Sequence, residues 1–247
     1  MTPPLAGESV LTAGPLEIGL QRTLQIREER LSNRPDACRL MYVSDIHLRQ
    51  GRSKTLNRQI LASAEQSEPH VILLGGDLVD RATELGELRN LIGALCKIAP
   101  VFAVGGNHDS GVGIPRVREA VVAGGAKWIH DCVETIFHGD RIISISGPEV
   151  PVASTLDGDV RILCAHNPRI WKTARHRGFD LVLAGHLHGC QFVAFEFHDR
   201  LYPGAFFYPY CYLTHQYQLT TLIVSRGVSD LIPIRWRCPR EVVLCYV

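Results

Sequence analysis

His186 and His188 are separated by one residue and directly follow an apolar run that ends at Gly185. The run 181–184 predicts a strand buried on both faces, because a short apolar run bounded by glycine is typical of such strands. Open α/β sheets bind ligands at the carboxyl ends of their strands, so the two histidines stand where a site is expected. A His-x-His pair alone is more often a surface loop or a satisfied polar pair than a metal site.

Side chains of the same chemical kind follow four other apolar runs, at residues 39–43, 71–74, 101–104 and 160–164. Carboxylates and imidazoles without thiolates suit divalent Mn, Zn, Fe or Co rather than a structural zinc site built from cysteines. The candidate metal ligands at the five strand ends are Asp45, His47, Asp77, Asn107, His166, His186 and His188.

Seven ligands are too many for one tetrahedral ion and predict two ions that share a bridging carboxylate, for which Asp77 is the natural candidate. Alternate residues of an extended segment project to the same side, so Asp45 can converge with His47, and His186 with His188. Two cations about 3.5–4 Å apart can clamp the oxygens of an in-line displacement and generate hydroxide from a bridging water. The expected substrate is a phosphate ester, because two cations offset its negative charge and that of the transition state.

The segments between these runs predict the elements that position the ligands. Apolar residues at helical spacing predict helices over 53–67, 83–98, 115–122 and 169–177. Strand and helix alternate up to residue 122, which is typical of βαβ units and a parallel sheet. From residue 127 the pattern changes to short strands at 128–129, 134–137 and 141–146, with further strands at 222–224 and 242–247. Residues 1–37 predict a leader with one or two strands over 16–31, packed on a single domain of residues 38–247.

Composition excludes little. The formal net charge of +1, with 26 basic and 25 acidic side chains, gives no argument for a nucleic-acid partner. We expect a cytoplasmic protein without a membrane span, because the chain has neither a signal peptide nor an apolar run of about 20 residues. Eight cysteines without a CxxC pair indicate free thiols in a reducing compartment.

Five blocks of this sequence, in order, resemble those of the calcineurin-like metallophosphoesterases: Asp45-x-His47, Gly76-Asp77-Leu-Val-Asp80, Gly106-Asn107-His108-Asp109, Ala165-His166 and Gly185-His186-Leu-His188. They span about residues 40–191, and together they are highly specific although each block alone is not. The tail 224–239 is similar to a bacterial branch of that family, which is often membrane-anchored. Two departures from that branch stand out: Cys190 replaces a usual glycine, and no membrane helix precedes the first block.

The resemblance implies an α/β fold in which two facing mixed β-sheets are flanked by helices, an α/β/β/α sandwich. It implies a first metal held by Asp45, His47, Asp77 and His188, and a second held by Asp77, Asn107, His166 and His186. His108 would not bind metal but would stabilise or protonate the leaving oxygen, and Asp80 would orient His108.

The implied activity is hydrolysis of a phosphodiester, a phosphomonoester or a pyrophosphate by a metal-bridging hydroxide. A lipid- or nucleotide-linked phosphate ester is one candidate substrate, and the oligomeric state stays open. The alternative is a catalytically silent binding or scaffold protein on the same fold. A degenerate member of that kind should have lost ligands or the catalytic histidine, and here all are present.

Other reactive side chains have simpler interpretations. Solvation is favoured over phosphate contact for Arg49 and Arg81, and packing over reactivity for Cys190. Asp109 fits either a helix start or support of a ligand. The aromatic stretch 206–217 predicts core packing or a lid strand, with an apolar wall for substrate or an oligomer contact as the alternative. Surface or core roles are expected for His70, His130, His138, His176, His198 and His215.

Overall fold

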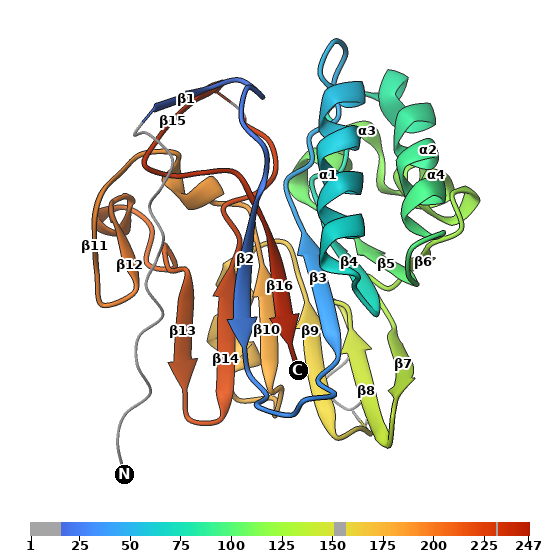
Figure 1. Ribbon diagram of the computed structural model, residues 1–247, viewed down its shortest axis with the longest axis vertical. Helices are drawn as coiled ribbons and strands as arrows, with labels where there is room; N and C mark the ends of the chain where they lie inside the picture. Colours follow the sequence, from blue (N-terminus) through green and yellow to red (C-terminus); the bar gives the residue numbers. More distant parts are fainter. Residues whose placement is uncertain (1–15, 151–156, 231) are drawn as a thin grey trace.

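Two six-stranded mixed sheets face each other in the computed structural model, which describes residues 16–150, 157–230 and 232–247 (Figure 1). The first sheet has the order β2 (Gln25–Arg30), β16 (Glu241–Tyr246), β3 (Arg39–Val43), β4 (Val71–Gly75), β5 (Val101–Val104) and β6 (Lys127–Trp128). The second has the order β13 (Thr214–Tyr217), β14 (Thr220–Val224), β10 (Leu181–Ala184), β9 (Val160–Cys164), β8 (Arg141–Ser146) and β7 (Val133–His138). The expected α/β fold with two mixed sheets is confirmed.

Parallel strands form the middle of each sheet. Strands β3 to β6 run parallel, whereas β16 is antiparallel to β3. Strands β8, β9, β10 and β14 also run parallel, with β7 and β13 antiparallel at the two edges. Two small ribbons stand apart from the sheets in Figure 1: β1 (Leu16–Ile18) with β15 (Ile234–Trp236), and β11 (Val193–Phe197) with β12 (Arg200–Pro203).

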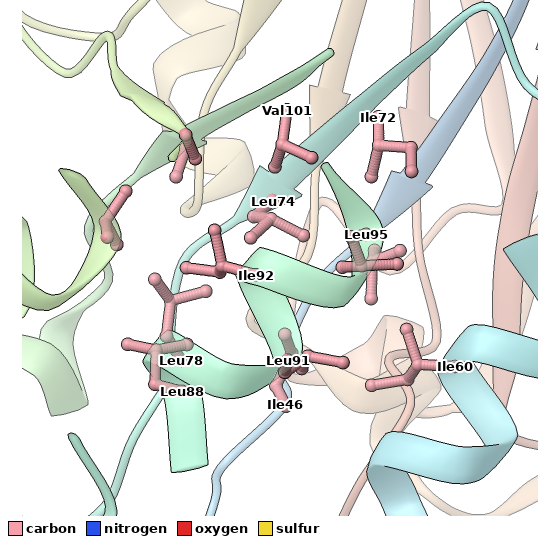
Figure 2. Close-up of a cluster of buried hydrophobic side chains, with 14 of the residues drawn as sticks. Ile46, Ile60, Ile72, Leu74, Leu78, Leu88, Leu91, Ile92, Leu95 and Val101 are labelled. Carbon is pink, nitrogen blue, oxygen red and sulfur yellow. The ribbon is translucent and has the colours of Figure 1, made fainter. Parts of the chain in front are cut away.

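Each central strand is buried on both faces because its alternate side chains enter different cores. In β3, Leu40 and Tyr42 lie between the two sheets, whereas Met41 and Val43 face the helices. Those helices are α1 (Ser53–Ser67), α2 (Leu85–Leu95) and α4 (Ile114–Ala123), and Figure 2 shows the cluster in which Ile60 of α1 and Leu91 of α2 pack near the sheet. This double burial explains why the strands read as continuous apolar runs.

The second sheet has a much thinner helical cover. The helix expected over 169–177 is only the turn η2 (Pro168–Ile170) followed by α5 (Trp171–Ala174), so its predicted length is wrong. Trp171 and Ala174 are the side chains of α5 that are buried against this sheet. Because they are three residues apart, a single helical turn is long enough to place both. The helix expected over 83–98 is likewise shorter, with the turn η1 (Ala82–Glu84) preceding α2.

Several elements were absent from the sequence expectations. Helix α3 (Asn107–Val112) begins within a ligand block and contains Gly111, so it shows no apolar stripe. Strand β11 exposes Phe195 and Phe197, so it lacks the buried alternate face that marks a strand. The remaining short elements are η3 (His188–Cys190) and η4 (Gly204–Phe206).

The first strands pair with the end of the chain. Strand β2 runs parallel to β16, and β1 runs antiparallel to β15. The expected leader, residues 1–15, lies outside the described residues, and the division at residue 37 stays a prediction. Among the described residues, no helix is long and apolar enough to cross a bilayer.

Glu241 joins the two sheets through a buried ion network. Its Oε1 accepts from Arg27 Nε of β2 at 3.1 Å and from the backbone N–H of Arg226 at 3.0 Å. Its Oε2 accepts from Arg226 Nε at 2.7 Å, and Arg27 also donates to the carbonyl oxygen of Val224 at the end of β14. Burial raises the pKa of Glu241, but the charges and hydrogen bonds of Arg226 and Arg27 outweigh it and bring the pKa down to about 2.

We expect the free energy of unfolding to fall as pH is lowered from the ordinary glutamate value of 4.5 to about 2. Because the folded pKa is depressed, the stabilisation is present above 4.5 and is lost as Glu241 is protonated. At neutral pH, Glu241→Gln should cost about 3–5 kcal/mol, since it leaves the buried guanidinium of Arg226 without its anion and Arg27 with Glu29 alone. Urea unfolding at neutral pH would measure the cost of the variant, and urea unfolding of the natural chain between pH 4.5 and about 2 would measure the pH effect. The exposed Glu65→Gln is the control, and equal stabilities of the two variants would contradict the role of the network.

Candidate functional site

All seven predicted ligands, with His108 and Asp80, lie together at the carboxyl ends of five strands. Strands β3, β4 and β5 of the first sheet lead into 45–47, 77–80 and 107–108. Strands β9 and β10 of the second sheet lead into His166, His186 and His188. The site is therefore built between the two sheets, where their parallel strands end at a common edge.

The backbone that carries the ligands is left-handed at five positions. Positive φ angles between 46° and 72° occur at Asp45, His47, Asp77, His186 and His188. The expected reason for convergence of the His-x-His and Asp-x-His pairs is therefore wrong, because these residues are not extended. Non-glycine residues adopt this region at a cost, and such strain concentrates at sites where the fold overrides local preference.

Two glycines let the backbone approach the ligands closely. A Cβ on Gly106 would lie 2.2 Å from Asp77 Oδ1, and one on Gly185 would lie 2.5 Å from Asp45 Oδ2. Any larger residue at either position would displace a carboxylate. Only glycine therefore fits directly before Asn107 and His186.

One group of acceptor atoms surrounds Nε2 of His166. Its Nδ1 lies 2.9 Å from the carbonyl oxygen of Gly75 and must donate there, so the neutral form of the ring carries its lone pair on Nε2. That lone pair faces Asn107 Oδ1 at 3.0 Å, His186 Nδ1 at 3.1 Å and Asp77 Oδ2 at 3.1 Å. Burial lowers the pKa of His166, but Asp77 and Asp45 raise it to about 9, so this place favours positive charge.

A second group surrounds Nε2 of His47 and His188. His47 Nδ1 lies 2.7 Å from Asp80 Oδ1, and His188 Nδ1 lies 3.0 Å from the carbonyl oxygen of Ser229. Both Nδ1 atoms donate, so the two Nε2 lone pairs face each other at 3.3 Å. Asp45 Oδ1 lies 3.7 Å from the Nε2 atom of His188. In the neutral form of both rings two acceptors thus face each other, an arrangement that a cation between them would satisfy.

Asp77 lies between the two groups. Its Oδ2 is 3.1 Å from Nε2 of His166 and 3.7 Å from Nε2 of His47, while Oδ1 accepts from the backbone N–H of His108 at 2.8 Å. Burial raises the pKa of Asp77, but the hydrogen bond and charge of His166 and the charge of His47 bring it down to about 2. This carboxylate therefore belongs to both groups and stays negatively charged at neutral pH.

His108 stands at the open side of the site. Its Nδ1 lies 3.1 Å from Asp80 Oδ1, the same oxygen that accepts from His47, and its side chain is 33% exposed. His108 also lies within ligand distance of the group that contains His47 and Asp77. Asp80 therefore fixes one nitrogen of each ring and leaves the other available.

Comparison with known proteins agrees with this geometry. The calcineurin-like phosphoesterase family matches residues 38–190, which is more than half of the 247-residue chain. This chain belongs to that family.

The chain is similar to several known proteins, and it covers a different share of the length of each. Phosphodiesterase YaeI of Escherichia coli (strain K12) is 27% identical over 228 residues, 83% of this chain and 80% of YaeI. The uncharacterized protein YpbG of Bacillus subtilis (strain 168) is 25% identical over 62% of this chain and 61% of its own length. TT1561 of Thermus thermophilus shares the fold with a TM-score of 0.50 and 12% identity, over 77% of this chain and 89% of TT1561.

In this calcineurin-like phosphoesterase, Asp109 joins two ligand loops. The side chain is fully buried, and its Oδ1 accepts from the backbone N–H groups of Leu78 and Val79 at 2.9 and 3.1 Å. Its Oδ2 accepts from Gly106 N–H at 2.8 Å, at the start of α3. Asp109 thus lies at a helix start and also supports a ligand loop, so both interpretations made from the sequence apply. The feature that indicated the helix start is an acidic residue in the first helical turn.

We expect Asp109→Asn to destabilise the protein by about 1–3 kcal/mol, because the new amide N–H₂ group faces a buried N–H donor. Chemical unfolding would measure the loss. The exposed Asp131→Asn is the matched control, and an unfolding free energy equal to that of the control would contradict the role of Asp109.

Two arginines beside the site differ in their surroundings. Arg49 donates to the carbonyl oxygen of Asp230 and lies 4.0 Å from Asp80 Oδ2, so the expectation of a freely solvated side chain is wrong for it. Arg81 is exposed, as expected.

Cys38, His70 and His138 form another group with ligand atoms within 4.8 Å of one another. His70 Nδ1 accepts from the backbone N–H of Arg39 at 2.9 Å, which places the proton of the neutral ring on Nε2. His70 then has no lone pair for a metal, so the expected packing role is favoured.

The aromatic stretch 206–217 divides into two parts. Tyr210 and Tyr217 pack against the outer core of the second sheet, as expected. Phe206, Phe207 and Tyr208 are 71%, 77% and 49% exposed, so the expectation of core packing is wrong for them. They lie at the end of η4 and in the loop after it, where they have no sheet to cover.

Proposed function

We propose that this chain is a di-metal phosphodiesterase. The observation that carries the proposal is the convergence of lone pairs in two groups that share Asp77 Oδ2, 3.1 Å from His166 and 3.7 Å from His47. The donor set of carboxylates, imidazoles and one amide fits Mn, Zn, Fe or Co. YaeI carries the name phosphodiesterase, which supports a diester over a monoester or a pyrophosphate as the substrate.

Each ligand has a proposed place. Asp45, His47 and His188 lie in one group and hold the first metal with Asp77. His166 and His186 lie in the other group and hold the second metal with Asn107 and Asp77. When bound, the two cations supply Lewis-acid activation of water and offset the charge of the phosphoryl group.

His108 is the proposed proton donor to the leaving oxygen. Asp80 Oδ1 lies 3.1 Å from Nδ1 and holds that nitrogen protonated, so Nε2 exchanges a proton with the substrate. Its exposed fraction of 33% is consistent with contact to substrate rather than burial among the ligands. Asp80 acts as a positioning residue, because it touches His108 and His47.

A substrate panel tests the proposal. Purified protein would be assayed with an aryl phosphodiester, an aryl phosphomonoester and a nucleotide pyrophosphate, each in Mn²⁺, Zn²⁺, Co²⁺ and Mg²⁺. We expect the diester to be hydrolysed with the highest kcat/KM, and chelation to remove the activity. A higher kcat/KM for either other class would overturn the diester assignment.

The second candidate is a catalytically silent scaffold. Near-zero metal content together with no activity in any added metal would favour it. The complete ligand set, with every Nδ1 contact that orients His47, His166 and His188 in place, argues against it.

A further inference from the structure

Cys190 and Cys211 place their sulfur atoms 3.0 Å apart beside the proposed metal centre. Cys190 ends η3, two residues after His188, and Cys211 lies between η4 and β13. A Cβ on Gly204 would lie 2.3 Å from the Cys190 sulfur and 3.0 Å from the Cys211 sulfur, so the backbone there confines both thiols. A shift of about 1 Å would bring the sulfurs to the disulfide distance of about 2.05 Å.

Access distinguishes the two thiols. Cys211 is buried, whereas Cys190 is partly exposed, as are Cys96 and Cys132. Cys132 directs its thiol to the carbonyl oxygen of Trp128 at 3.6 Å. A reagent from solvent can therefore reach Cys190 first and leave Cys211 as the resolving thiol.

A third thiol lies nearby but is engaged elsewhere. Cys238 donates to the carbonyl oxygens of His188 at 3.4 Å and Gly189 at 3.6 Å. Its sulfur is directed at the backbone of η3, which makes Cys211 the nearer partner for Cys190 and Cys238 the competing partner in a test.

We propose that Cys190 and Cys211 form a peroxide-sensitive dithiol that closes reversibly to a disulfide. The Cys190 thiol attacks a hydroperoxide, the O–O bond breaks, and the products are the sulfenic acid of Cys190 and an alcohol or water. The Cys211 sulfur then attacks the Cys190 sulfur, the S–O bond breaks, and water leaves as the S–S bond forms. The two thiols lose two electrons and two protons to the peroxide, and a small thiol reductant reverses the bond by exchange.

The disulfide would constrain the segment that presents His188. Four consecutive residues, from His188 to Gln191, have positive φ angles of 51°, 58°, 59° and 55°. A bond from Cys190 to Cys211 ties this strained turn to the loop after η4 and closes the chain around the β11–β12 ribbon. Cross-links that close such loops raise stability chiefly by restricting the unfolded chain, so the oxidised protein should melt at a higher temperature.

The test uses the reduced full chain treated with hydrogen peroxide. Peptide mapping by mass spectrometry without reductant should find a Cys190–Cys211 linked pair that disappears after dithiothreitol. In Cys211→Ser, a dimedone probe should instead label the sulfenic acid of Cys190. Cys132→Ser is the matched control and should form the linked pair like the natural chain.

Two results would overturn the proposal. One is a peptide map in which Cys190 stays a thiol or is linked to Cys238 while peroxide is consumed. The other is a melting temperature of the oxidised chain that does not exceed that of the reduced chain. Because the peptide map needs no variant, the result stands even where a substitution impairs folding.

Discussion

Asp77→Asn should lower kcat/KM for an aryl phosphodiester by about 10³-fold or more, because it removes the one charge that both proposed metals share. Asp77 Oδ2 lies 3.1 Å from His166 and 3.7 Å from His47, whereas Oδ1 accepts from the His108 backbone at 2.8 Å. Asparagine keeps the size of the side chain, so the Oδ1 contact can persist while the charge is lost. The bound metal should fall below two ions per chain, which elemental analysis would measure.

The matched control for this variant is Asp131→Asn, the same change at an exposed carboxylate. It should leave both the metal content and kcat/KM as they are in the natural chain. An Asp77→Asn protein that keeps two ions and most of its activity would show that Asp77 is not the bridge.

His108→Ala should lower kcat by about 10²–10⁴-fold for a diester with an alkyl leaving group, the range that a general acid contributes. The loss should be much smaller for a p-nitrophenyl leaving group, because nitrophenolate departs without a proton. The metal content should stay unchanged, since His108 is proposed to touch substrate rather than metal. Measuring kcat over a series of leaving groups separates proton donation from a general loss of structure.

His176→Ala supplies the control for the histidine change, because His176 lies on the second sheet's side, where it contacts Tyr217 and Arg175. It should leave kcat and the dependence on the leaving group unaltered. A loss in His108→Ala that is equal for all leaving groups, or accompanied by a loss of metal, would assign His108 to the metal site instead.

Much of the architecture was predictable because short stretches of the sequence determine it. The apolar runs of β3, β4, β5, β9 and β10 are short, and a glycine or polar residue follows each run directly or, after β9, one residue later, so each strand and its carboxyl end can be placed from sequence. Strand β1 falls within the strands expected over 16–31, but its partner β15 and the ribbon β11–β12 follow no such rule. Strand β11, for example, carries exposed Phe195 and Phe197, and no buried face imposes a period of two on it.

The sequence by itself determined which residues have the chemistry for the site and that strand ends deliver them, since these follow from residue type and spacing along the chain. Only the tertiary structure decided how they meet. The left-handed backbone at Asp45 and His188, the carbonyl oxygens of Gly75 and Ser229 that set the imidazole protons, and the sulfur contact of Cys190 with Cys211 all depend on segments distant in sequence. Every residue has the same backbone carbonyl group. The sequence therefore cannot indicate which carbonyl oxygens orient His166 and His188.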